Sequence, residues 1–158
     1  DIKLLMIGSA GFGGNVVTPY VQEVQKLVEK AGERVKFTGY IENQKLYRYY
    51  QSADIQVIPS LWEEAAGLIA IEGMLSGLPL IITKSGGMIE YAPSNVAVWI
   101  DRDNIIPNLE AAIIQLADDK EKRKEMSELS LEQAKEFPKK KFYEDYIEVF
   151  EHEGTRKR

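Results

Sequence analysis

The chain has 158 residues, of which 44 % are hydrophobic, enough to bury the core of one domain. It has no cysteine, which excludes disulfides and thiolate metal sites, and its net charge of −5 argues against a nucleic-acid partner. No apolar run reaches the about 18 residues that a transmembrane helix needs.

Short apolar runs, several rich in β-branched residues, predict five strands. They span residues 2–7, 35–39, 54–59, 79–83 and 96–100. Helical segments of about ten to fifteen residues alternate with them, which is typical of βαβ units and of a parallel sheet with helices on both faces. The sequence therefore predicts an α/β fold with a Rossmann-like, doubly wound parallel sheet. In such folds, ligands bind beyond the carboxyl ends of the strands.

Apolar side chains at helical spacing predict the helices between these strands. Gly32 is expected to end the first helix. Asn43 is the expected N-cap of the second, whose inner face extends to Ala53. The third runs from about residue 67 to 76, and a short fourth lies near Gly87.

The pattern is helical after the last strand. One predicted helix starts near Pro107, a polar helix covers residues 120–136, and an aromatic helix follows Pro138. The chain starts at Asp1, without a methionine, and enters a strand almost at once. We therefore expect it to be part of a longer protein.

The segment between the third strand and the third helix carries the most information about function. The free amides of Gly67, Leu68 and Ile69, with the positive end of the helix dipole, suit a phosphate or pyrophosphate. Glu72 lies five residues into the helix, about 7.5 Å along its axis, where two ribose hydroxyls could reach it. Glu64 precedes the helix, where sugar hydroxyls would be natural partners. A glutamate at this position also stabilises a helix N-terminus through the helix dipole. This segment alone therefore does not decide between a binding site and an ordinary helix start.

Three motifs occur in order along this part of the chain. They read Glu64-Ala65-Ala66-Gly67-Leu68-Ile69-Ala70-Ile71-Glu72-Gly73-Met74, then Gly77-Leu78-Pro79-Leu80, then Gly86-Gly87-Met88-Ile89-Glu90. They resemble the motifs E-P-F-G-L-x-x-x-E-A-M, G-x-P-V and G-G-x-x-E of glycosyltransferase family 4, in the C-terminal domain of retaining GT-B enzymes. The spacing identifies Glu64, not Glu63, as the first glutamate. The resemblance covers nearly the whole chain.

The resemblance implies a role for each motif residue. Glu64 would contact hydroxyls of the donor sugar, as the catalytic residue, and Glu72 would hold the ribose. The other implied donor contacts are the backbone of Tyr40 and Ile41 for the base, the amides of Gly67, Leu68 and Ile69 for the pyrophosphate, and Gly86, Gly87 and Glu90 along the same cleft.

The resemblance also implies the organisation of the enzyme. Residues 1–155 would form the nucleotide-sugar-binding domain, and the acceptor domain would lie outside this chain. Retention by front-face displacement needs positioning and stabilisation of the departing diphosphate, with no metal or other cofactor. Family members carry an arginine and a lysine just before the region where this chain starts, so we expect the fragment to be inactive alone. Ala65-Ala66 replaces the usual Pro-Phe, which alters the expected donor preference.

The expected ligand is a nucleotide diphosphate sugar, with uridine as the commonest base among relatives. The acceptor would be a glycan or a lipid-linked molecule, and the enzyme would act in polysaccharide assembly in the cytoplasm. The basic run Lys139-Lys140-Lys141 would allow a contact with the inner face of the membrane. Two alternatives remain: a non-catalytic nucleotide-sugar-binding module, and half of a sugar-nucleotide epimerase.

Other chemical motifs carry less weight. Asp101-Arg102-Asp103 has the D-x-D form that holds metals in other glycosyltransferases, but capping and turn formation explain it better. The glycine-rich loop at residues 8–14 does not match G-x-G-x-x-G and is interpreted as a turn at the ligand side of the sheet. Ser60 and Ser85 have no histidine nearby in sequence, and His152 lies on a charged helix end, so a hydrolase triad has no support.

Overall fold

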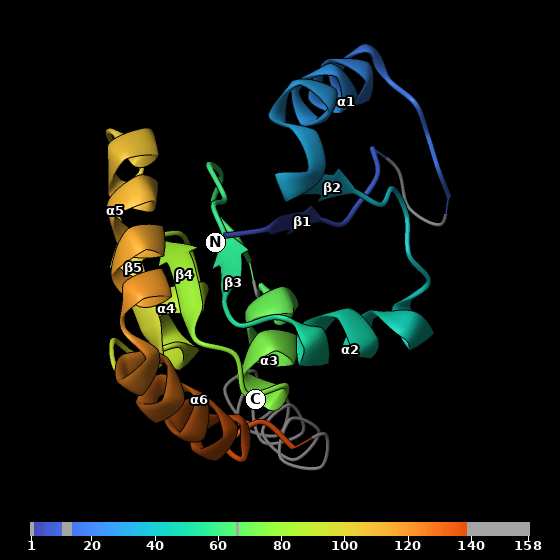
Figure 1. Cartoon of the computed structure of the whole chain (residues 1–158). Coiled ribbons are helices and arrows are strands. Elements are labelled where there is room, and N and C mark those ends of the chain that lie inside the picture. Colours follow the sequence, from blue (N-terminus) through green and yellow to red (C-terminus); the bar gives the residue numbers. More distant parts are fainter. Residues whose placement is uncertain (1, 11–13, 66, 139–158) are drawn as a thin grey trace, which may run out of the picture. The chain divides into compact units, whose positions relative to one another are not determined.

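The computed structural model describes residues 2–10, 14–65 and 67–138. The chain divides into two compact units, Asp1–Tyr49 and Tyr50–Arg158 (Figure 1). Each unit has parallel strands connected through helices, which confirms the predicted α/β class.

The first unit contains a parallel strand pair and one long helix. Strands β1 (Leu4–Met6) and β2 (Val35–Phe37) pair in parallel. Helix α1 (Pro19–Ala31) connects them and begins after Thr18, whose hydroxyl accepts a hydrogen bond from the first turn. Gly32, with φ of 68°, ends the helix as predicted, and a short 3₁₀ turn follows.

Helix α2 (Asn43–Ser52) differs from the prediction at both ends. Asn43 is its first residue and not its N-cap, and Ala53 lies beyond its last turn. The N–H of Lys45 donates to the carbonyl of Glu42 at 2.8 Å, so the first turn already includes Asn43. The helix therefore begins one residue earlier than it would with Asn43 as the N-cap.

The second unit is built on a three-stranded parallel sheet. Strands β3 (Gln56–Ile58), β4 (Leu80–Thr83) and β5 (Ala97–Ile100) lie in the order β3-β4-β5, and all residues of β4 are buried. The observed strands are shorter than the predicted apolar runs. Pro59 and Pro79 flank β3 and β4 and cannot donate to a ladder, which explains two of these boundaries.

Helices cover both faces of this sheet. They are α3 (Leu68–Leu75), α4 (Met88–Tyr91), α5 (Ile105–Asp118) and α6 (Lys120–Ala134). Alternate side chains of β4 enter two separate core clusters. Leu80 and Ile82 pack with residues of α3 and α4, and Ile81 packs with residues of α5. The doubly wound arrangement predicted from the sequence is therefore present in this unit.

Some predicted features lie outside the described residues. They are the centre of the glycine loop (11–13), Ala66, the aromatic helix after Pro138, Lys139-Lys140-Lys141 and His152. None of the helices described is both long enough and apolar enough to span a bilayer.

Candidate functional site

The backbone and carboxylate of Glu64 are fixed by hydrogen bonds in the β3–α3 loop. Its N–H donates to the hydroxyl of Ser85 at 3.2 Å, and its carbonyl accepts the N–H of Gly87 at 2.9 Å. The hydroxyl of Ser60, which is buried, donates to Glu64 Oε1 at 2.7 Å. Glu64 Oε2 forms no hydrogen bond with the residues that the structure describes, so it can accept one from a ligand.

Gly86 and Gly87 allow the β4–α4 loop to approach Glu64 closely. A Cβ atom on Gly86 would lie 2.0 Å from the carbonyl oxygen of Glu64, and Gly86 has a φ of +49°. A Cβ on Gly87 would lie 2.8 Å from the carbonyl oxygen of Ala65. Both glycines were predicted to line a ligand cleft, and the structure gives them a further role, because only glycine fits at this contact.

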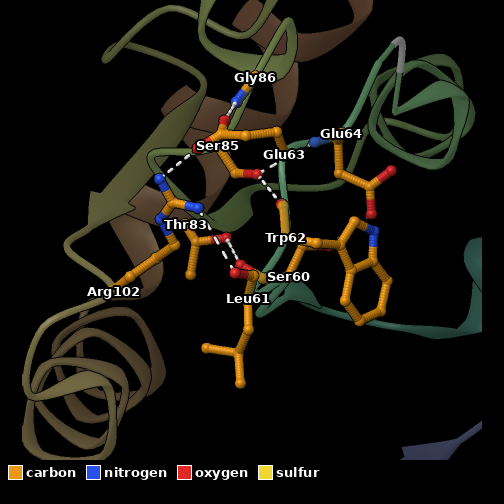
Figure 2. A network of polar contacts seen from close by, with 9 residues as sticks. All are labelled: Ser60, Leu61, Trp62, Glu63, Glu64, Thr83, Ser85, Gly86 and Arg102. Carbon is orange, nitrogen blue, oxygen red and sulfur yellow. Dashed lines mark hydrogen bonds and ion pairs between the residues drawn. The ribbon is translucent and has the colours of Figure 1, made fainter.

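The rest of the β3–α3 loop is also fastened to its neighbours (Figure 2). The hydroxyl of Thr83 donates to the carbonyl of Ser60 at 2.7 Å, and that of Ser85 donates to the carbonyl of Trp62. Glu63 Oε2 accepts the N–H of Gly86 at 2.6 Å, and Glu63 Oε1 pairs with Arg102. These two donors hold the pKa of Glu63 below its ordinary value, with Arg102 the larger cause.

The start of α3 has the features expected of an anion site. Gly67 is its N-cap, in a left-handed conformation with φ of 52°, and no side chain caps the helix. A Cβ on Gly67 would lie 2.4 Å from the Cγ of Met88, so α4 packs closely beneath this glycine. Leu68 and Ile69 are 64 % and 43 % exposed, so the first turn of the helix is open to solvent.

Glu72 lies on the same helix and is held by a tyrosine from α2. The hydroxyl of Tyr50 donates to Glu72 Oε2 at 2.9 Å. Tyr50 is half-buried and packs against the core, and burial, followed by the hydrogen bond and the charge of Glu72, raises its pKa. The structure therefore holds one carboxylate oxygen of Glu72 and leaves Oε1 without a partner among the described residues.

Tyr91 connects the start of α3 with two acidic residues. Burial raises the pKa of Tyr91, and the nearby carboxylates of Glu64 and Glu90 raise it further. Its hydroxyl is buried without a hydrogen-bond partner among the residues described, and it would lie 2.9 Å from a Cβ on Gly67. The Tyr91 hydroxyl thus lies beside Gly67 and within electrostatic reach of the carboxylates of Glu64 and Glu90.

Tyr40 and Ile41 belong to the first unit, in the turn after β2. The N–H of Tyr40 donates to Asn15 Oδ1 at 2.7 Å, and a Cβ on Gly39 would lie 2.4 Å from the same oxygen. Because this N–H is already engaged, any contact of the turn with a base would use the carbonyl of Tyr40 or the backbone of Ile41.

The D-x-D sequence has other partners in the structure. The carboxylate of Asp101 pairs with Lys84 at 2.9 Å, and Arg102 pairs with Glu63. The N-cap of α5 is Asn104, in a left-handed conformation with φ of 55°, so capping by either aspartate is wrong. The predicted turn is present at residues 103–104. In the ranges that the structure describes, no three His, Cys, Asp or Glu side chains cluster in a way that could hold a metal ion.

A hollow of about 540 Å³ lies along β5, α5 and α6, with Trp99 and Lys122 in its walls. None of the predicted site residues lines it. The hydrogen-bonded carboxylates at the start of α3 remain the better candidate site, because their chemistry and not the size of a hollow identifies them.

Several residues of this site were not predicted from the sequence. They are Tyr50, Ser60, Ser85, Glu63, Tyr91 and Arg102. Helical spacing places Tyr50 on the inner face of its helix, and a buried tyrosine hydroxyl usually finds a partner, but the sequence does not indicate that this partner is Glu72. The serines and Arg102 act through contacts that the sequence does not reveal.

The family model of "Glycosyl transferases group 1" matches residues 1–133 of the chain. Spore coat protein SA of Bacillus subtilis is 28 % identical over 153 residues, which is 96 % of this chain and 41 % of that protein. The D-inositol 3-phosphate glycosyltransferase of Corynebacterium diphtheriae is 29 % identical over 138 residues, 87 % of this chain and 31 % of that protein. The chain thus spans less than half the length of these relatives.

Two solved structures are similar in fold. Sucrose-phosphate synthase from Thermosynechococcus elongatus superposes with a TM-score of 0.81 at 23 % identity, covering 98 % of this chain and 39 % of that chain. Anabaena HepE, in a complex with UDP and glucose, superposes with a TM-score of 0.80 at 22 % identity, covering 94 % of this chain and 40 % of that one.

Proposed function

This chain belongs to the group 1 glycosyl transferases and has the fold of a GT-B glycosyltransferase domain, and we propose that it is the donor-binding, C-terminal part of a retaining enzyme of family 4. It would bind a nucleotide diphosphate sugar, and a domain outside this chain would present the acceptor. The complex of HepE with UDP and glucose supports a uridine nucleotide as the first ligand to test.

One observation carries this proposal. Two glutamates, Glu64 before α3 and Glu72 within it, each have one carboxylate oxygen held by a protein hydroxyl, from Ser60 at 2.7 Å and Tyr50 at 2.9 Å. Such carboxylates are oriented before a ligand arrives, which lowers the entropy lost on binding. The uncapped start of α3 lies between them in sequence, where a pyrophosphate would connect a sugar to a ribose.

In the proposed reaction, the protein positions the two substrates and stabilises the charge of the departing diphosphate. The acceptor hydroxyl would attack the anomeric carbon on the face from which the diphosphate leaves, so configuration is retained. Amides at the start of α3 would stabilise part of the diphosphate charge, and Glu64 would hold the sugar hydroxyls. We propose that the rest of this stabilisation comes from residues outside the chain, so the fragment binds donor but transfers sugar poorly.

We further propose that binding needs no metal, and that the full enzyme extends a glycan or lipid-linked acceptor in the cytoplasm. The carboxylates of Asp101 and Glu63 are paired with the side chains of Lys84 and Arg102, which supports binding without a metal ion. A non-catalytic binding module would need no carboxylate that contacts the sugar. A Glu64 variant that no longer prefers the nucleotide sugar over the nucleotide would therefore favour an enzyme over such a module.

Calorimetric titration of the chain with UDP, GDP, ADP and dTDP, with EDTA present throughout, tests this function. We expect UDP to bind most tightly of the four, because HepE, which has the same fold, is found in a complex with UDP. The amides of α3 and Glu72 would take its diphosphate and its ribose. Repetition with Mg²⁺ in place of EDTA is the matched control. Binding to none of the four contradicts the donor-binding function, and binding only with Mg²⁺ contradicts metal independence.

A further inference from the structure

We propose that Glu63 and Arg102 form a latch that positions Glu64 for the donor sugar. The latch consists of these two side chains and the N–H of Gly86. Glu63 and Arg102 would not touch the donor, so both are positioning residues. The inference rests on the proposed role of Glu64 and extends it to residues that the family motifs do not include.

The latch fastens three loops at the carboxyl ends of neighbouring strands. Glu63, on the β3–α3 loop, accepts the N–H of Gly86 from the β4–α4 loop at 2.6 Å. Its other oxygen pairs with Arg102 from the β5–α5 loop, and Arg102 also donates to the carbonyl of Leu61 at 3.4 Å. One carboxylate therefore links all three loops, as Figure 2 shows.

The contribution of Arg102 differs from that of the other contacts to this loop. Thr83, Ser85 and Gly87, which hold residues 60–64, all come from one short stretch at the end of β4. Among the described residues, Arg102 is the tie to this loop that comes from the β5 side. Without it the loop would be fastened from the β4 side alone, and it could rotate about that line of contacts.

Global stability is a poor explanation for the latch. The side chains of Arg102 and Glu63 are 37 % and 64 % exposed, and ion pairs this exposed contribute little to folding. However, the next residue is Glu64, whose backbone lies against Gly86 so closely that no Cβ fits between them. Glu63 accepts the N–H of Gly86, and Gly86 lies against the backbone of Glu64, so loss of the Glu63 contact would let Gly86 shift and Glu64 with it. Small displacements strongly affect a positioned group.

Calorimetry on Glu63→Gln and Arg102→Gln tests the latch. The quantity is the ratio of the dissociation constants for UDP and UDP-glucose, or for the counterparts with the base found in the titration above. We expect each variant to lower the preference for the nucleotide sugar over UDP about fivefold and to leave the affinity for UDP unchanged. This is the size expected for the loss of one partly exposed, charged hydrogen bond. The double variant should lose less than the sum of the two single losses, because each single variant already breaks the ion pair that the two residues share.

Glu110→Gln, which neutralises an exposed glutamate on α5 outside the latch, is the matched control and should keep the wild-type ratio. A merely structural role would lower the affinities for UDP and nucleotide sugar equally and leave the ratio unchanged. An unchanged ratio in both latch variants overturns the latch while the donor-binding function stands. A wild-type chain that binds neither ligand overturns both.

Discussion

Replacement of Glu72 by alanine is expected to weaken binding of the nucleoside diphosphate about a hundredfold, or about 3 kcal/mol. The reason is that a carboxylate accepting two ribose hydroxyls makes charge-assisted hydrogen bonds, which are stronger than neutral ones. Helix α3 and the hydroxyl of Tyr50 hold Glu72 in place, so its carboxylate is oriented before the ribose binds. Titration of the variant with UDP measures the loss.

A nucleotide without ribose hydroxyls provides the control for this variant. The wild-type chain and Glu72→Ala should bind 2′,3′-dideoxy-UDP with the same affinity. Tyr50→Phe keeps the buried ring but removes the hydroxyl that orients Glu72, so it should weaken UDP binding by a smaller factor, about fivefold. If Glu72→Ala weakens binding of the dideoxy nucleotide as much as that of UDP, Glu72 does not hold the ribose.

Gly86→Ala is expected to lower the free energy of unfolding by about 3 kcal/mol. An alanine Cβ would lie 2.0 Å from the carbonyl oxygen of Glu64 and 2.8 Å from its carbonyl carbon, and backbone atoms cannot move aside as a side-chain end can. The φ of +49° adds strain for any residue with a side chain. Denaturant unfolding of the chain measures the change through the midpoint and slope.

Gly77→Ala separates the strain of the backbone angle from the clash. Gly77 lies in the same unit with a φ of +71°, but the atoms nearest to its Cβ would be side-chain atoms of Leu131 and Ser127, at 3.3 Å. This variant should lose about 1 kcal/mol. Equal losses in Gly77→Ala and Gly86→Ala would mean that the close approach to Glu64 carries no cost.

Much of the fold could be predicted because apolar periodicity reports which side chains are buried. Leu80, Ile81 and Ile82 form a continuous apolar run because β4 is buried on both faces. Boundaries were less accurate, because they depend on individual hydrogen bonds. The bond from Lys45 to Glu42 makes the expected cap, Asn43, the first residue of α2, and Asn104 replaces an aspartate at the start of α5.

Spacing along the chain relates the candidate site residues only within one segment, and the more distant candidates came from the family motifs. The spacing between Glu64 and Glu72 is local, because a loop and one helix connect them. The partners of these glutamates come from other segments: Tyr50 bonds across 22 positions, and Arg102 reaches Glu63 across 39. Chain folding creates such contacts, and no local pattern records them. The requirement for glycine at position 86 also depends on a backbone from another loop.

The most direct test of the account compares UDP with its sugar nucleotide on the wild-type chain and on Glu64→Ala, by calorimetry with EDTA present. We expect Glu64→Ala to bind UDP as the wild type does and to bind the nucleotide sugar about tenfold more weakly, because in the proposed site Glu64 contacts the sugar and Glu72 the ribose. A variant that loses equal affinity for UDP and for the nucleotide sugar would contradict this division of roles and, with it, the assignment of the donor site to the two ends of this segment.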